Sequence, residues 1–273
     1  MGIINMTPDS FSLDGCIAAS QNYTQKAVAI AEKFIQQGAD ILDIGGESSR
    51  PGAAAISVEE EIGRVIPTIK ALSRKIKTPL SIDTYKSSVA QQALDNGASI
   101  VNNIRGIKPE RSLLKMVCRY NAAIVLMHMR GNPQTMQKKV FYRQGVVSEV
   151  IAALRKAIEN CLDIGIKSDK IIIDPGIGFG KTVEDNLEII NRLTEFKKLK
   201  YPILIGTSRK SFIGAVLNRD VQHRLFGTIA TVCASICHGA HIVRVHDVEA
   251  VQEAVKMTDA VLNFSPSVKK EGR

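Results

Sequence analysis

The chain has 273 residues, of which 45% are hydrophobic and 23% charged, and its formal net charge is +9. Its apolar segments are interrupted well before the roughly 20 residues that a membrane-spanning helix needs, so we predict no membrane partner and a cytoplasmic location. The basic residues are dispersed and only 5% of residues are aromatic, so we expect no nucleic-acid partner. These values favour one enzyme domain over residues 1–273.

Eight short apolar segments, each followed by helical sequence, run the length of the chain. They end in polar or glycine-rich clusters, a pattern that predicts a (β/α)8 barrel, the TIM-barrel fold. In that fold the active site lies at the carboxyl ends of the strands, so the polar residues there are the functional candidates. The segments are Gly2–Thr7, Asp40–Gly46, Leu80–Thr84, Ile100–Ile104, Ala122–His128, Ile171–Gly176, Pro202–Thr207 and Ile242–Asp247.

Local signals mark the elements between these strands. Residues Asn22–Gln37 have the spacing of an amphipathic helix, and Gly38 follows as a residue that takes a left-handed cap easily. Ser57 and Glu60 form a capping-box pattern, which predicts the start of the next helix. The stretch 129–144 contains Gly, Asn and Pro, so we expect a long loop on the rim there.

The five cysteines are an odd number and are scattered, which argues against a disulfide framework. Cys233 and Cys237 could share a metal ion with His238 or His241. No second pair of ligands has the spacing of a zinc site, so we interpret both cysteines as part of the hydrophobic core.

Polar residues occur at the ends of at least six predicted strands. One such residue alone is usually a helix cap or an otherwise satisfied polar group. The whole set on one rim favours a binding site, because burying so many charges is costly unless a ligand or partner compensates them. The residues are Asp83, Asn102, Asn103, His128, Asp174, Ser208, Arg209, Lys210, Arg244 and His246.

The carboxylates and the amide in this set indicate a heterocyclic ligand. Asp83 and Asp174 suit the edge of an amidine-like or guanidine-like ring, since a carboxylate accepts two parallel hydrogen bonds from such an edge. Asn102 can both donate to and accept from the same ring.

The basic residues indicate an anion on that ligand. The sequence Ser208-Arg209-Lys210 follows the seventh strand, where this fold frequently binds phosphate. Arg244 and His246 are two positions apart on the eighth strand and therefore point to the same side, where they would complete an anion pocket. The residues together predict a polar heterocycle that carries phosphate.

Seven ordered motifs resemble those of the dihydropteroate synthase family. Their order and lengths are specific, and they span nearly the whole chain. The motifs are Met1-Gly-Ile-Ile-Asn-Met-Thr-Pro-Asp-Ser-Phe-Ser, Asp43-Ile-Gly-Gly-Glu-Ser-Ser-Arg-Pro-Gly-Ala, Ser81-Ile-Asp-Thr-Tyr-Lys, Leu126-Met-His-Met-Arg-Gly-Asn-Pro-Gln-Thr-Met-Gln, Asp174-Pro-Gly-Ile-Gly-Phe-Gly-Lys, Gly206-Thr-Ser-Arg-Lys-Ser-Phe-Ile and Arg244-Val-His-Asp-Val.

The resemblance implies an enzyme of folate synthesis. Members of the family join the methylene carbon of hydroxymethyl-dihydropterin diphosphate to the amine of 4-aminobenzoate and release pyrophosphate. The resemblance also implies that the carbon–diphosphate bond ionises first, that Mg²⁺ is the cofactor, and that the chain forms a homodimer. The apolar residues Ile229, Val232, Val251 and Val255 could belong either to the core or to the dimer face.

The matching positions imply individual roles for the pterin and diphosphate sites. Asp83, Asp174, Lys210, Arg244 and His246 form the predicted catalytic set. The pterin would be held by Asp83, Asn102, Asp174 and Lys210, between walls formed by Ile104, Met127, Phe179 and Gly206. The diphosphate would contact Asn5, Arg244 and His246, and Asn5 would also contact Mg²⁺.

Two rim loops would close around the amine. The first carries Phe11, Ser12 and Asp14, the second carries Ser49, Arg50 and Pro51, and Ser208 would lie where aminobenzoate enters.

Two features within the motifs depart from the usual family pattern. Leu13 is an insertion between Ser12 and Asp14, and Asn103 stands where aspartate is usual. The altered first loop leaves open a catalytically silent paralogue that binds pterin. A third alternative, a corrinoid-dependent methyltransferase of the same superfamily, should lack the Thr7-Pro-Asp-Ser-Phe-Ser and Ser208-Arg-Lys-Ser-Phe-Ile signatures, and both are present.

Overall fold

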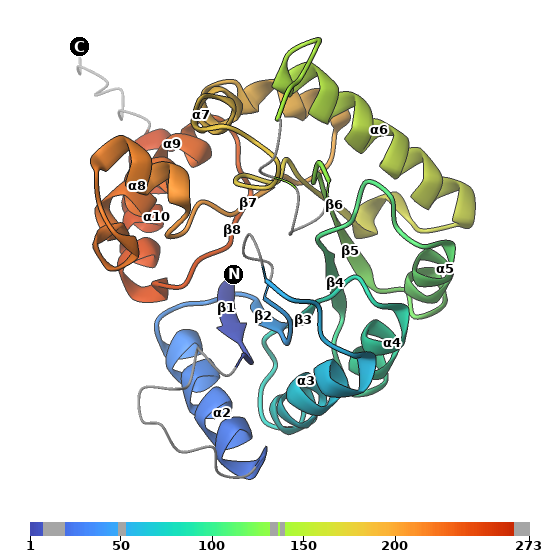
Figure 1. Ribbon diagram of the computed structural model, residues 1–273. Helices are drawn as coiled ribbons and strands as arrows, with labels where there is room; N and C mark the ends of the chain where they lie inside the picture. Colours follow the sequence, from blue (N-terminus) through green and yellow to red (C-terminus); the bar gives the residue numbers. More distant parts are fainter. Residues whose placement is uncertain (8–19, 49–52, 132–135, 137–139, 265–273) are drawn as a thin grey trace, which may run out of the picture.

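The structure is a computed structural model that describes residues 1–7, 20–48, 53–131, 136 and 140–264. Strands form its centre and helices surround them, as Figure 1 shows. Each strand runs parallel to its sheet neighbours and is followed along the chain by a helix, so the predicted (β/α)8 barrel is confirmed.

Six strands form one continuous parallel sheet in chain order. The register pairs Gly45 with Asp83 and Asp83 with Asn102, so the polar ends of successive strands come level with one another. The strands are β1 (Gly2–Asn5), β2 (Leu42–Gly45), β3 (Leu80–Asp83), β4 (Ile100–Asn103), β5 (Ala123–Met127) and β6 (Ile171–Asp174).

The remaining strands, β7 (Leu204–Ile205) and β8 (Ile242–Val243), are shorter than the segments predicted at 202–207 and 242–247. They pair with each other, and single bridges join them to the larger sheet and close the ring. Pro202 has no N–H to donate, so only its carbonyl takes part in the β-ladder here, where it accepts the Ile173 N–H. The bridges are Ile173 to Ile203 and Gly2 to Val245.

Side chains alternate between the interior of the barrel and the outer core, as they must on a strand. The outward set, such as Ile44 and Ile82, packs under the helices. The inward set begins with an apolar cluster that includes Met1, Ile100, Val125 and Leu204. Nearer the carboxyl ends the inward positions become polar, and this change places charged groups inside the barrel mouth.

The helices form the outer ring. The helix predicted at 22–37 is α2, and Gly38 follows it with φ of +91°. The helices of this ring are α2 (Ser20–Gln36), α3 (Val58–Ser73), α4 (Ser87–Asp95), α5 (Arg111–Arg119), α6 (Val146–Ile164), α7 (Val183–Asn191), α8 (Ser211–Leu217), α9 (Leu225–Cys237) and α10 (Val248–Leu262).

The cap predicted for α3 forms in part. The Ser57 hydroxyl accepts the Glu60 backbone N–H at 3.0 Å, as the pattern requires. The Glu60 carboxylate is turned to the Arg64 guanidinium instead of back to the cap. An i, i+4 ion pair on the helix surface therefore competes with the second bond of the capping box.

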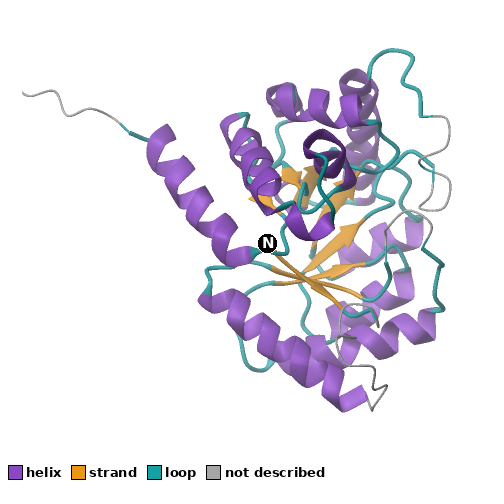
Figure 2. Cartoon of the chain, turned by 60° about the vertical axis from the view of Figure 1, so that its left-hand side comes forward, coloured by secondary structure: helices purple, strands orange, loops and turns teal. Residues whose placement is uncertain are grey.

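The last two long helices pack on each other through apolar side chains. Val232 of α9 and Val251 of α10 are buried, and Ile229 and Val255 pack against them. These four residues therefore belong to the core. Figure 2 shows that the carboxyl-terminal half of α10 projects beyond the body of the barrel.

The cysteine interpretation needs correction. Cys233 is only partly buried and Cys237 is exposed, because Cys237 is the last residue of α9 and leaves the packed face of that helix. In the part of the chain that the structure describes, no three His, Cys, Asp or Glu side chains converge as metal ligands. Among the same residues, no helix has the length and apolar character needed to cross a membrane.

Candidate active site

A cavity lies at the carboxyl ends of the strands. Ten of the residues predicted for the site line it. Five predicted residues within the described chain do not line it: Asn5, Asp83, Asn103, His128 and Arg209. The lining residues are Ile3, Asn102, Ile104, Met127, Asp174, Ile177, Phe179, Gly206, Ser208, Lys210, Arg244 and His246.

One side of the cavity is a closed network of charges around Arg244. Its Nε lies 2.6 Å from Asp43 Oδ2 and its Nη2 lies 2.7 Å from Asp83 Oδ2. The Asn102 amide also donates to Asp43 Oδ2, at 3.0 Å. Two carboxylates share one guanidinium, so this network is compact. It joins β2, β3 and β4 to Arg244, which directly follows β8.

The protonation of this network follows from its burial. Burial raises the pKa of Asp83 to about 7, although the Arg244 guanidinium opposes the shift. Burial works against the charge on Arg244, yet Asp43 and Asp83 raise the pKa of Arg244 above its ordinary value. Arg244 therefore keeps its charge throughout the working pH range, whereas Asp83 titrates close to neutrality.

The other side of the cavity carries Asp174 and Lys210. Asp174 Oδ1 accepts the Gly176 backbone N–H at 2.7 Å, and burial raises the pKa of this carboxyl. The Lys210 Nζ lies 3.9 Å from the centre of the Phe179 ring, within cation–π range. Burial lowers the pKa of Lys210 to about 8. Within the described residues Lys210 forms no ion pair, so its charge faces the cavity.

A glycine-rich loop after β6 forms the adjoining wall. Gly176, Gly178 and Gly180 all have positive φ, between +63° and +81°. A Cβ on Gly176 would lie 1.9 Å from the carbonyl oxygen of His128, so only glycine fits against the end of β5. This close approach brings the Phe179 ring to the cavity.

Lys181 ends this loop, yet it is only 2% exposed. Its Nζ lies 3.0 Å from Nδ1 of His128 and 3.1 Å from the carbonyl oxygen of Phe179. Burial lowers the pKa of Lys181 to about 7 and the pKa of His128 to about 2, so the imidazole is neutral. Neither residue lines the cavity, and the pair lies behind its wall.

His246 and Ser208 form a third part of the site. Ser208 Oγ lies 3.0 Å from His246 Nδ1 and accepts the His246 backbone N–H at 3.2 Å. Burial lowers the pKa of His246 to about 4, so the ring offers hydrogen bonds and no positive charge at pH 7. Arg209, between Ser208 and Lys210 in sequence, turns away and pairs with Asp247. The predicted anion motif is thus divided between the cavity and the surface.

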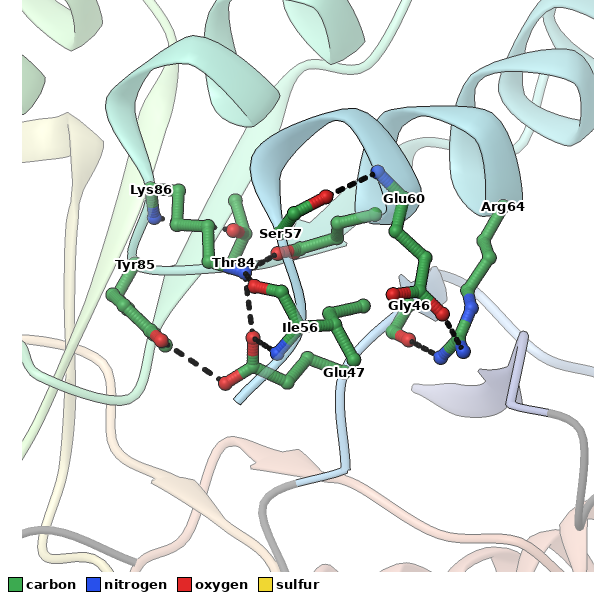
Figure 3. Close-up of polar contacts among 10 residues, drawn as sticks. Gly46, Glu47, Ile56, Ser57, Glu60, Arg64, Thr84, Tyr85 and Lys86 are labelled. Atoms are coloured by element: carbon green, nitrogen blue, oxygen red, sulfur yellow. Dashed lines mark hydrogen bonds and ion pairs between the residues drawn. The ribbon is translucent and has the colours of Figure 1, made fainter. Parts of the chain in front are cut away.

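Beside the cavity, a second ion network joins both ends of the connection from β2 to α3 (Figure 3). The Lys86 Nζ lies 2.6 Å from Glu47 Oε2, 2.7 Å from Glu61 Oε2 and 2.7 Å from the carbonyl oxygen of Ile56. The Tyr85 hydroxyl donates to Glu47 Oε1 at 3.0 Å. Since Glu47 and Ile56 flank the second predicted rim loop, the network fixes where that loop leaves the barrel.

The other predicted positions are distributed as follows. Asn5 is half-buried at the end of β1, where an amide oxygen is a hard donor suited to Mg²⁺. Asn103 is buried away from the cavity, and its Oδ1 accepts the Arg105 backbone N–H at 2.9 Å. Phe11, Ser12, Asp14, Ser49, Arg50 and Pro51, and part of the loop expected at 129–144, lie outside the described residues.

Three residues with clear structural roles were not assigned from the sequence: Asp43, Glu47 and Lys181. Asp43 could have been found from strand alternation, since it lies two positions before the inward-facing strand end. Glu47 and Lys181 occupy irregular connections, where no periodicity reveals the direction of a side chain. Their partners, Lys86 and His128, are distant in sequence.

Comparisons with known proteins agree with this geometry. Residues 1–246 match the family model described as Pterin binding enzyme. The dihydropteroate synthase of Synechocystis sp. is 46% identical over 266 residues, which cover 96% of this chain and 89% of that protein.

Solved structures give the same result. The dihydropteroate synthase of Clostridium difficile, solved in the presence of pteroic acid, has a TM-score of 0.89 and 42% identity, covering 96% of each chain. The enzyme of Xanthomonas albilineans, solved with 4-aminobenzoic acid, has a TM-score of 0.89 and 38% identity, covering 97% of this chain and 93% of that one. With sequence, fold and cavity in agreement, this chain belongs to the dihydropteroate synthase family of pterin-binding enzymes.

Proposed function

We propose that the cavity binds hydroxymethyl-dihydropterin diphosphate and that the chain joins this substrate to 4-aminobenzoate, with release of pyrophosphate. Membership of the family makes the chain a transferase of folate biosynthesis. The observation that carries the substrate assignment is the convergence of Asp174, Asn102 and Lys210 on one cavity with an aromatic wall. A carboxylate, an amide and an ammonium match the donors and acceptors along a pterin edge.

In the proposed reaction, the bond from the methylene carbon to the diphosphate oxygen breaks first. Pyrophosphate leaves with the bonding electron pair, and the dihydropterin delocalises the resulting cation. The nitrogen of 4-aminobenzoate then attacks the methylene carbon, and its proton passes to the released pyrophosphate or to solvent water. No nucleophilic side chain takes part.

The charged residues divide the work in this scheme. Asp174 accepts hydrogen bonds from the pterin and orients it. The Lys210 ammonium and the Phe179 ring form walls of the pocket. Arg244 retains its charge and faces the departing diphosphate, and neutral His246 donates a hydrogen bond to it. We propose that Asp83 serves the site through Arg244, because Asp83 is paired there and does not line the cavity.

We propose that Mg²⁺ would act here as a partner of the substrate. It is commonly held by one or two protein oxygens together with substrate phosphates, and Asn5 offers one such oxygen. When bound, the ion neutralises charge on the diphosphate. The test is isothermal titration of pterin diphosphate with and without Mg²⁺, using Asn5→Ala. We expect weaker binding of the diphosphate in the variant and unchanged binding of the free pterin.

The first experiment mixes the purified chain with pterin diphosphate, Mg²⁺ and 4-aminobenzoate, and measures dihydropteroate and pyrophosphate. Product that requires 4-aminobenzoate is the expected result. Pterin binding without product would instead support the silent paralogue, whose basis is the inserted Leu13. We also propose that the reaction takes place in the cytoplasm and that sulfonamides, which imitate aminobenzoate, compete for the site.

We further propose that the chain forms a homodimer through α8, α9 and α10, which lie together in Figure 1. Large exposed apolar side chains on neighbouring helices favour an interaction surface there. Phe226 of α9 is 83% exposed, and Phe264, two residues after the end of α10, is 75% exposed. The other exposed apolar residues here are Val216, Leu217, Val221, Met257, Val261 and Leu262.

Light scattering tests the dimer. The wild-type chain should have twice the monomer mass of 29.7 kDa, and Phe226→Asp should shift it to the monomer. Phe141→Asp is the matched control, because Phe141 is also exposed but lies outside α8, α9 and α10. A monomeric wild type, or an equal effect of both variants, would contradict this interface.

A further inference from the structure

Lys181 is a buried charge that the proposed reaction does not use. Its side chain is 2% exposed and lies behind the cavity wall, so it contacts no substrate. Burying an ammonium costs stability, and an apolar side chain of similar size is often neutral or better. Stability alone therefore gives no reason for a lysine at this position.

The contacts of Lys181 show what it holds. Its Nζ has three hydrogen-bond partners: the Phe179 carbonyl at 3.1 Å, His128 Nδ1 at 3.0 Å and the His128 carbonyl at 3.5 Å. An ammonium has three donors, so each can be used. One side chain thereby ties the glycine-rich loop after β6 to the end of β5.

Three glycines make the backbone of this loop conformationally permissive, so contacts with neighbouring elements help to fix its position. Gly176, Gly178 and Gly180 have positive φ and no side chains to pack, and hydrogen bonds join this loop to neighbouring elements. These include the Gly178 N–H to Asn186 Oδ1 at 2.6 Å and the Tyr142 hydroxyl to the Gly180 carbonyl at 2.8 Å. Phe179, whose ring faces the cavity, is held at its carbonyl by Lys181.

We propose that Lys181 is a positioning residue of the pterin site, which fixes the Phe179 wall through the Phe179 carbonyl and the imidazole of His128. The inference rests on the proposed pterin site. Phe179 in turn lies under the Lys210 ammonium, 3.9 Å from its ring centre, so a shift of the loop would move both groups. The wall contacts the substrate equally before and during reaction, so Lys181 acts on substrate binding and little on the chemical step.

Electrostatics give Lys181 a second effect on the same site. Burial raises the pKa of Asp174, while the Gly176 N–H and the charges of Lys210, Lys181 and Arg244 lower it. Removal of the Lys181 charge therefore raises the pKa of Asp174 further. The Asp174 carboxylate then becomes protonated at a higher pH. The pH below which pterin binding is lost should therefore rise.

The test compares Lys181→Met with the wild type by steady-state kinetics and by calorimetric titration of pterin. We expect the KM for pterin diphosphate and the Kd for pterin to rise about tenfold, with kcat changed less than about twofold. The acidic limb of pterin binding should move to higher pH. Lys156→Met, which removes an exposed lysine on α6, is the control and should match the wild type.

Variants of the partner residue separate positioning from general stability. His128→Asn keeps an acceptor near Nδ1 and should bind pterin almost as the wild type does. His128→Leu removes that acceptor and should reproduce the rise in KM. Thermal unfolding is measured for every variant, because a merely structural lysine would lower the melting temperature without moving the pH limb.

The outcomes are distinguishable. If the wild type binds pterin and Lys181→Met has an unchanged Kd and pH limb, the inference is wrong while the proposed function stands. Equal losses in stability, kcat and KM without a pH shift would also overturn it. If the wild type binds no pterin, the proposed site fails and this inference fails with it.

Discussion

The two sides of the cavity use their charges differently. Around Arg244, the charged groups are paired with one another, and Asp43 and Asp83 lie within 2.7 Å of the guanidinium. On the opposite side, Asp174 is held by a backbone N–H, and Lys210 has an aromatic ring as its neighbour. Pairing fixes the position of the Arg244 guanidinium at the barrel mouth, whereas Asp174 and Lys210 form no ion pair among the described residues and keep more of their hydrogen-bonding capacity for a ligand.

The largest effect is expected when the paired side loses its cation. Arg244→Met would leave the Asp43 and Asp83 carboxylates buried without a counterion. We expect the free energy of unfolding to fall by about 3–5 kcal/mol, measured by urea denaturation at pH 8. The pH is set at 8 because the pKa of Asp83 is about 7 in the wild type, so its carboxylate is ionised there. A loss below about 1 kcal/mol would show that the network does not stabilise the barrel mouth.

The unpaired side should respond in binding and not in stability. Asp174→Asn removes an acceptor of two charge-assisted hydrogen bonds of about 1.5 kcal/mol each, so the Kd for pterin should rise roughly a hundredfold. Calorimetric titration gives the Kd, and urea denaturation should show a stability close to that of the wild type. Near-normal binding would remove Asp174 from the pterin site.

The smallest effect concerns the charge on Lys210. Because burial lowers its pKa to about 8, the ammonium is present below pH 8 and is lost as the pH rises through this value. The KM for pterin diphosphate should then increase above pH 8, by at most about tenfold per pH unit. Lys210→Met should have a higher KM without this alkaline rise. If the KM for the variant rises above pH 8 as it does for the wild type, that rise belongs to the titration of another group.

The difference between the two sides could be predicted only in part from the sequence. The sequence placed Asn102, Asp174 and Arg244 at the ends of strands and Lys210 just after a strand, and the structure brings all four to the cavity. Alternation does not reveal which of these charges pair with each other. The distance from Asp43 to Arg244 in the chain is 201 residues, and only closure of the barrel brings them together.

The sequence by itself determined the repeating strand–helix order, the rim on which the polar groups gather and the family motifs, since these depend on local periodicity and on short segments. Only the tertiary structure decided that Arg244 is committed to Asp43 and Asp83, that Arg209 turns outward, and that Lys181 is buried against His128. Burial and pairing are properties of neighbours across the barrel, and neighbours distant in sequence are set by folding alone.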